Sequence, residues 1–151
     1  MTQSLTKIYL HVVFSTKHRI PFLKNKDVRC KLHGYMADVF NQYESQPIIV
    51  GGVDDHIHAL IRLGKNQTIP KVVGEVKRKS SRWIKEFFEG YDNFQWQGGY
   101  AAFSVGYKEL DIIIRYIDTQ ETHHDKRYFK EELIELLIEN AIEYDERYLW
   151  D

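Results

Sequence analysis

The sequence predicts an α+β fold, with a four-stranded, mostly antiparallel sheet and helices packed over one face. Two observations lead to this prediction. Runs of β-branched and aromatic residues alternate with segments whose apolar residues recur at helical spacing, in the order β-α-β-β-α-β-α-α. The chain of 151 residues also has the length of one ordinary domain and contains no linker or internal repeat. We therefore expect residues 1–151 to form a single domain.

The first part of the chain predicts three strands and two helices. Strands are expected at 5–16, 46–55 and 56–63, where β-branched residues are frequent. A helix is expected at 25–44, because its apolar residues recur every three or four positions. A second long helix is expected at 68–90, because a threonine cap and an early-turn proline mark its start.

The second part of the chain predicts one more strand and two more helices. The strand covers 94–107 and contains a Gly-Gly interruption, which is typical of a bulge. Helices are expected at 108–123 and 125–149, and the last one is acidic on its polar face. The order of the elements resembles the split βαβ arrangement of ferredoxin-like folds, followed by C-terminal helices.

The composition is that of a globular protein, with 43% hydrophobic and 28% charged residues. The N-terminal stretch lacks the basic and long apolar regions of a signal peptide, and no apolar run is long enough to span a bilayer. Cys30 is the single cysteine, which excludes an internal disulfide and a cysteine-cluster zinc site. We expect a soluble, cytoplasmic protein with no membrane association.

The net charge of −1 conceals an uneven distribution. Residues 131–151 contain eight acidic residues and one basic residue, Arg147. Positions 1–130 therefore contain 20 basic and 14 acidic residues, a net charge of +6. A moderately basic body is compatible with a nucleic-acid partner, although an ordinary solvated charge distribution would look the same.

The stretch VGGVDDHIHALIRL carries two histidines, His56 and His58, one residue apart in a predicted strand. Side chains at i and i+2 point to the same face of a strand, so both imidazoles project together. Burying them is costly unless their nitrogens are satisfied, and a divalent metal would satisfy them. Roughly 0.3 such pairs arise by chance in a chain of this composition. Two solvated histidines on a surface strand therefore remain an alternative.

The predicted helix at 108–123 supplies a second pair of candidates. Tyr116 and Gln120 are four residues apart and so lie on one helical face. A tyrosine can act as a covalent nucleophile, and a glutamine carbonyl is an oxygen ligand suited to Mg²⁺ or Mn²⁺. A core-edge aromatic residue and a surface amide are the plain alternative.

The predicted helix at 68–90 carries a basic run, EVKRKSSRW. Lysine and arginine neutralise phosphates, serine hydroxyls bind them, and tryptophan stacks on bases. The candidates for DNA binding are Lys77, Arg78, Lys79 and Arg82, together with Ser80, Ser81 and Trp83. A solvated helix face with the tryptophan in the core is the alternative.

Taken in order, these motifs resemble the HUH single-tyrosine transposases (TnpA-type) of small bacterial and archaeal insertion sequences. The matching stretches are HIH at 56–58, VKRKSSRWI at 76–84, WQGGYAAFSV at 96–105 and YIDTQETHH at 116–124. The first strand, YLHVVFSTKHRIPFL, is also similar to that family. The resemblance covers nearly the whole chain, and the ordered combination is far more specific than any single motif.

The resemblance implies that His56, His58 and Gln120 hold Mg²⁺ or Mn²⁺ and that Tyr116 is the nucleophile. It further implies an HUH-type fold, single-stranded DNA hairpins as the substrate, a 5′-phosphotyrosine intermediate, and a homodimer whose active sites can be composite. Two other functions remain open. One is a related HUH nuclease in replication or plasmid relaxation, and the other is a domesticated hairpin-binding protein without activity.

Four further residues near these motifs have no assigned role. Asp54 and Asp55 precede the two histidines, where they either orient an imidazole or form the turn between strands. His123 and His124 follow the tyrosine helix and are either contacts to the site or capping groups.

Overall fold

The computed structural model describes residues 2–124 and 128–151, except for the side chains of 123 and 124. Its four strands are β1 (Ile8–Ser15), β2 (Gln46–Gly52), β3 (His56–Leu63) and β4 (Ala101–Val105). They form one sheet in the order β2-β3-β1-β4, and every neighbouring pair is antiparallel. The predicted fold class is confirmed.

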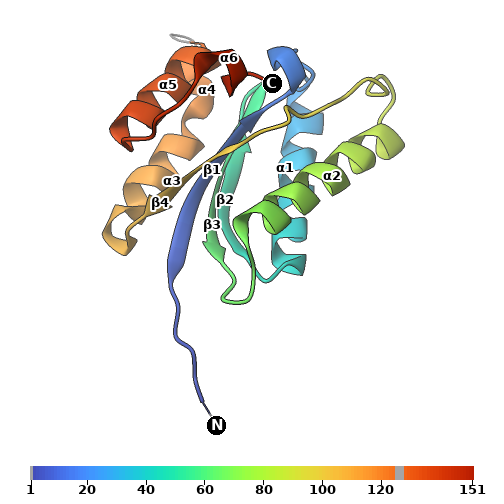
Figure 1. The fold of residues 1–151 in the computed structure, drawn as a ribbon. Helices are drawn as coiled ribbons and strands as arrows, with labels where there is room; N and C mark the ends of the chain where they lie inside the picture. The colour runs from blue at the N-terminus through green and yellow to red at the C-terminus, as the bar shows by residue number, and fades with distance from the viewer. Residues whose placement is uncertain (1, 125–127) are drawn as a thin grey trace.

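Helices cover both faces of this sheet, which corrects the expected placement over one face (Figure 1). α1 (Lys26–Gln42) and α2 (Ile69–Phe87) pack on one side, and α3 (Leu110–Asp118) and α5 (Phe129–Glu139) pack on the other. The reason lies in strand β1, which presents apolar side chains to both faces of the sheet. Leu10, Val12 and Phe14 face α1 and α2, whereas Tyr9 and Val13 face α3 and α5.

The starts of α1 and α2 agree with the sequence because each has a capping side chain. Asn25 accepts a hydrogen bond from the backbone N–H of Val28, and Thr68 accepts one from that of Lys71. α2 ends at Phe87, three residues before the predicted end. Among the described residues, no helix is long and apolar enough to cross a membrane.

The C-terminal part is more broken than the sequence predicted. The segment expected as one helix divides into a 3-10 turn η2 (Tyr107–Glu109), α3, and α4 (Gln120–His124). Thr119 ends α3, and its hydroxyl donates to the carbonyl oxygen of Arg115. The last predicted helix begins at α5, after residues 125–127, which lie outside the described residues. It stops at Glu139, because Ala141 has a φ of 54°, and a short α6 (Glu146–Leu149) follows.

The fourth strand is shorter than predicted, and the Gly-Gly pair lies before it rather than in a bulge within it. Trp96 forms an isolated bridge with Thr16, next to the 3-10 helix η1 (Lys17–Arg19). The backbone N–H groups of Gly98 and Gly99 donate to the backbone carbonyl oxygen of Asp151 instead of to a strand. The glycine pair therefore connects the bridge to β4.

His33 on α1 is a partly buried histidine on the face toward β2. Among the described residues, its Nε2 is a buried atom without a hydrogen-bond partner. The pKa of His33 is lowered to about 4, mainly by burial and also by the neighbouring Arg29, while Glu121 acts in the opposite direction. The folded protein therefore holds this imidazole neutral at pH values where the unfolded chain protonates it.

We predict that His33→Gln flattens the pH dependence of stability in acid. Below pH 6.5 the unfolded chain binds a proton that folded His33 does not, so the free energy of unfolding falls as pH decreases toward about 4. The loss from one such histidine approaches about 1.4 kcal/mol per pH unit. Urea unfolding at several pH values between 4.5 and 7 measures it, with the exposed His18→Asn as control. An unchanged slope in His33→Gln would contradict the assignment.

Candidate metal and tyrosine site

The register of the sheet places His56 and His58 on the face covered by α3 and α5. On β3 they lie opposite Ser15 and Val13 of β1, and neither has exposed surface. Ile57, between them, points to the other face and joins the core under α1 and α2. The predicted common orientation is confirmed, and the alternative of two solvated histidines is wrong.

Each of the two imidazoles is held at its Nδ1 by a neighbouring side chain. Nδ1 of His56 lies 2.7 Å from Oδ1 of Asp55, so Asp55 is the aspartate that orients an imidazole. Nδ1 of His58 lies 2.8 Å from Nε2 of His11 on β1. With both Nδ1 atoms engaged, the two Nε2 atoms are directed at a common point, where a side chain from α5 enters.

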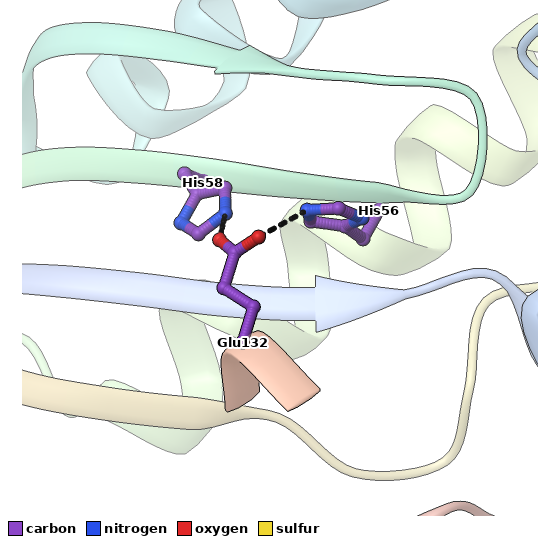
Figure 2. A group of neighbouring side chains, drawn as sticks. All are labelled: His56, His58 and Glu132. Carbon is purple, nitrogen blue, oxygen red and sulfur yellow. Dashed lines mark ion pairs between the residues drawn. The ribbon is translucent and has the colours of Figure 1, made fainter. Parts of the chain in front are cut away.

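That side chain is Glu132, whose carboxylate lies between the two histidines (Figure 2). Its Oε1 is 2.7 Å from Nε2 of His58, and its Oε2 is 3.8 Å from Nε2 of His56. The carboxylate has no exposed surface. Burial of a carboxylate costs several kcal/mol unless hydrogen bonds and opposite charges compensate it, so this group depends on its partners.

Tyr116 and Gln120 complete the cluster. The Tyr116 hydroxyl donates to Oε1 of Glu132 at 2.7 Å, and its ring lies edge-on to His58 with 5.5 Å between centroids. The amide nitrogen of Gln120 donates to the same oxygen at 3.2 Å, and its carbonyl oxygen lies 3.3 Å from Nε2 of His56. Both side chains therefore face the histidines, although the helix breaks between them at Thr119.

The residues fit a divalent cation. His56, His58 and Glu132 each offer one ligand atom, and these atoms lie within 4.8 Å of one another. Two imidazole nitrogens and a carboxylate oxygen are a donor set that binds divalent transition-metal ions, including Mn²⁺. Among the predicted ligands, Gln120 offers a further oxygen beside His56.

Glu132 was not found from the sequence. It lies three residues after Phe129 and one before Leu133, on the buried stripe of α5. A carboxylate inside the apolar stripe of an amphipathic helix is unusual and is the signal that could have identified it. The overall acidity of 131–151 concealed it, because seven other acidic residues surround it in the sequence.

His11 is a second buried histidine that sequence reasoning did not single out. The pKa of His11 is lowered to about 3, mainly by burial and also by the nearby His58, while Glu132 acts in the opposite direction. His11 is therefore a neutral imidazole in the folded protein. In that form it offers one N–H donor and one nitrogen acceptor.

The basic residues of α2 are not brought to this cluster, because α2 lies on the other face of the sheet. Arg78 pairs with Glu75, Lys79 donates to Gln42, and Lys77 donates to the carbonyl oxygen of Gly99. Arg82 is exposed. Burial lowers the pKa of Lys77 to about 8.

Ser80 and Trp83, the other candidates on the same helix, make contacts within the protein. The hydroxyl of Ser80 accepts a hydrogen bond from the indole N–H of Trp96. Trp83 stacks on Tyr35 with 4.8 Å between centroids and an interplanar angle of 9°. These contacts agree with the alternative in which the tryptophan of the basic run packs inside. The side chains of His123 and His124 lie outside the described residues.

The fold and the site define the class of this protein. It is an α+β protein whose strand β3 presents two buried histidines to a glutamate and a tyrosine from covering helices, a candidate metal and tyrosine site. The chain belongs to the IS200-like transposase family, because the family model described as "Transposase IS200 like" matches residues 4–120. The match includes His56, His58, Tyr116 and Gln120 and ends before Glu132.

Two solved structures share the fold. A proposed transposase from Deinococcus radiodurans has a TM-score of 0.61 at 22% identity, covering 80% of this chain and 98% of that one. A REP-associated tyrosine transposase bound to a REP hairpin has a TM-score of 0.60 at 14% identity, covering 82% of this chain and 73% of that one. None of the curated proteins is significantly similar to this chain.

We predict that Mn²⁺ raises the melting temperature of the protein and that Glu132→Gln loses most of this rise. The substitution keeps the shape of the side chain but removes the charged oxygen, and a carboxylate binds a divalent cation more strongly than a neutral amide. Gln120→Ala is expected to have a smaller effect. Thermal unfolding with and without Mn²⁺ measures the shift, with the exposed Glu139→Gln on the same helix as control. An equal rise in Glu132→Gln would show that this carboxylate is not a ligand.

Proposed function

We propose that the protein is a metal-dependent transposase that nicks and rejoins single-stranded DNA at hairpin-bearing element ends, with Tyr116 as nucleophile. The observation that carries the proposal is the shared contact at Glu132. One carboxylate oxygen lies 2.7 Å from both the Tyr116 hydroxyl oxygen and Nε2 of His58. A candidate nucleophile and a candidate metal ligand therefore meet at one point, which supports the role that the family resemblance implies for each.

The residue types suit the transfer of a DNA strand. The Tyr116 oxygen would form a bond to phosphorus while the bond to the 3′-oxygen breaks, which leaves a 5′-phosphotyrosine and a free 3′-OH. The phosphotyrosine is a diester like the bond that it replaces, so another 3′-OH can attack it without ATP. A divalent cation bound at His56 and His58 would polarise the scissile phosphate and neutralise its developing charge.

Entry of DNA into this cluster requires α5 to shift. His56 and His58 are fully buried, and the ring of Phe129 on α5 lies 4.4 Å from that of His56 between centroids. A phosphodiester cannot contact both the imidazoles and Tyr116 while α5 keeps this position. Gln120 belongs to the segment that carries the tyrosine, so it would stay beside His56 when Glu132 leaves. The proposed oxygen ligand is thus Glu132 in the closed form and Gln120 in the open one.

The proposed partners are DNA hairpins and a second copy of the chain. The structural neighbour described as bound to a REP hairpin supports a hairpin substrate. The basic residues of α2 (Lys77, Arg78, Lys79 and Arg82) are the proposed phosphate contacts, and Arg78 and Arg82 are exposed. In the single chain, Tyr116 lies against the histidines of its own sheet. The homodimer that the family implies could use this arrangement in each subunit or exchange the tyrosine helices.

We predict that Tyr116→Phe abolishes a covalent protein–DNA adduct and leaves hairpin binding largely intact, because only the attacking oxygen is removed. The measurement is a denaturing gel with labelled single-stranded DNA that spans an element end, with Mn²⁺ or Mg²⁺ and with EDTA. Tyr107→Phe is the matched control, since Tyr107 is exposed and lies outside the cluster. An adduct that persists in Tyr116→Phe would refute the nucleophile. Binding by the wild-type protein without any adduct would point to a hairpin-binding protein.

We predict that replacing Lys77, Arg78 and Arg82 together by alanine weakens DNA binding at every sequence and flattens its salt dependence. Loss of three phosphate contacts lowers the slope of log K against log salt by about 2 on single strands. Fluorescence anisotropy at several salt concentrations measures it, with thermal unfolding as a check of the fold. Lys108→Ala, on the far side of the sheet, is the control. Unchanged affinity in the triple variant would show that the DNA runs elsewhere.

A further inference from the structure

His11 contacts the candidate ligand His58 and is buried away from the solvent. It lies on β1 beside β3, where it is a diagonal neighbour of His58, which pairs with Val13 two residues further along β1. Its ring is 2% exposed and stacks on that of His58 with 5.0 Å between centroids. Phe103 and Tyr116 pack around the remaining edge of the ring.

The contact between the two rings bears on the tautomer that His58 adopts when a cation binds between its Nε2 and the carboxylate of Glu132. A neutral imidazole carries one proton, so a His58 that offers the lone pair of Nε2 to a cation must keep its proton on Nδ1. That N–H is buried and needs an acceptor, because an unsatisfied buried donor costs about 1–3 kcal/mol. Nε2 of His11 is the atom at hydrogen-bonding distance, 2.8 Å away.

We propose that His11 is a positioning residue of the metal centre, whose Nε2 accepts a hydrogen bond from the Nδ1–H of His58 and so directs the Nε2 lone pair of His58 at the cation. The inference rests on the proposed function, because it assumes that His56 and His58 bind a divalent ion. It adds a residue of β1 to a site otherwise built from β3 and the C-terminal helices.

The chemistry of the pair explains why a histidine suits this position better than a carboxylate. His56 is oriented by the carboxylate of Asp55, which is partly exposed. Position 11 is fully enclosed and lies on the same side of the sheet as the buried Glu132. A second carboxylate there would add an uncompensated charge in the interior. A neutral imidazole accepts the hydrogen bond without adding a charge. A hydrogen-bond partner of a metal-binding histidine fixes the orientation of its ring, and loss of such a partner typically weakens metal binding roughly 10–100-fold.

The experiment is calorimetric titration of Mn²⁺ into the full chain without DNA, together with electron paramagnetic resonance of free Mn²⁺. Phenylalanine in His11→Phe fills the space but cannot accept a hydrogen bond. We therefore expect the Kd for Mn²⁺ to rise roughly 10–100-fold. His11→Gln places a carbonyl oxygen near the former Nε2 and should recover most of the affinity. Phe103→Leu is the matched control, because it also alters a packing neighbour of the ring but removes no acceptor. Thermal unfolding of each metal-free variant checks the fold.

Each outcome decides a different point. A wild-type protein that binds no Mn²⁺ removes the metal from the proposed function itself. A wild-type protein that binds, together with folded His11→Phe of equal affinity, overturns the role of His11 and leaves the proposed function standing. His11→Gln as weak as His11→Phe, with both folded, also overturns it. If His11→Phe does not fold, ¹⁵N spectra of the Mg²⁺-loaded wild type decide, since a proton on Nε2 of His11 would prevent that atom from accepting from His58 and would contradict the inference.

Discussion

The arrangement of the site depends on a carboxylate held away from water. Glu132 has no exposed surface, and an isolated buried charge of this kind would destabilise the fold by several kcal/mol. Its Oε1 accepts from Tyr116 and Gln120 and lies against His58. The same contacts that stabilise the carboxylate therefore fix α5 on the sheet, set the position of the tyrosine and close the site.

This dependence links the part of the chain that defines the family to the part that follows it. The family match ends at 120, so it contains both histidines, the tyrosine and the glutamine, whereas α5 lies beyond it. α5 contributes Phe129, Leu133 and Leu137 to a core shared with Val13 and Phe103. Apolar packing of that stripe offsets the cost of bringing a carboxylate inside. The closed arrangement is thus a property of the C-terminal segment as much as of the family domain.

The two faces of the sheet divide the candidate functions. One face carries the buried cluster, and the other carries α2 with its basic residues. A DNA strand that contacts both must pass around an edge of the sheet, which is formed by β2 on one side and β4 on the other. Lys77 donates to the carbonyl oxygen of Gly99, just before β4, so the basic helix reaches that edge.

The sequence by itself determined the strands and the long helices, and it identified His56, His58, Tyr116 and Gln120 of the candidate site. Period-two spacing put His56 and His58 on one face, and a threonine cap marked the start of α2, because these are local effects of neighbouring residues. The helix breaks at Thr119 and Ala141 were not predicted, and the cover on both faces of the sheet was decided by tertiary packing. Glu132 and His11 could not be assigned from local patterns. Each lies far along the chain from the histidine that it contacts, and only the sheet register and the docking of α5 bring these side chains together.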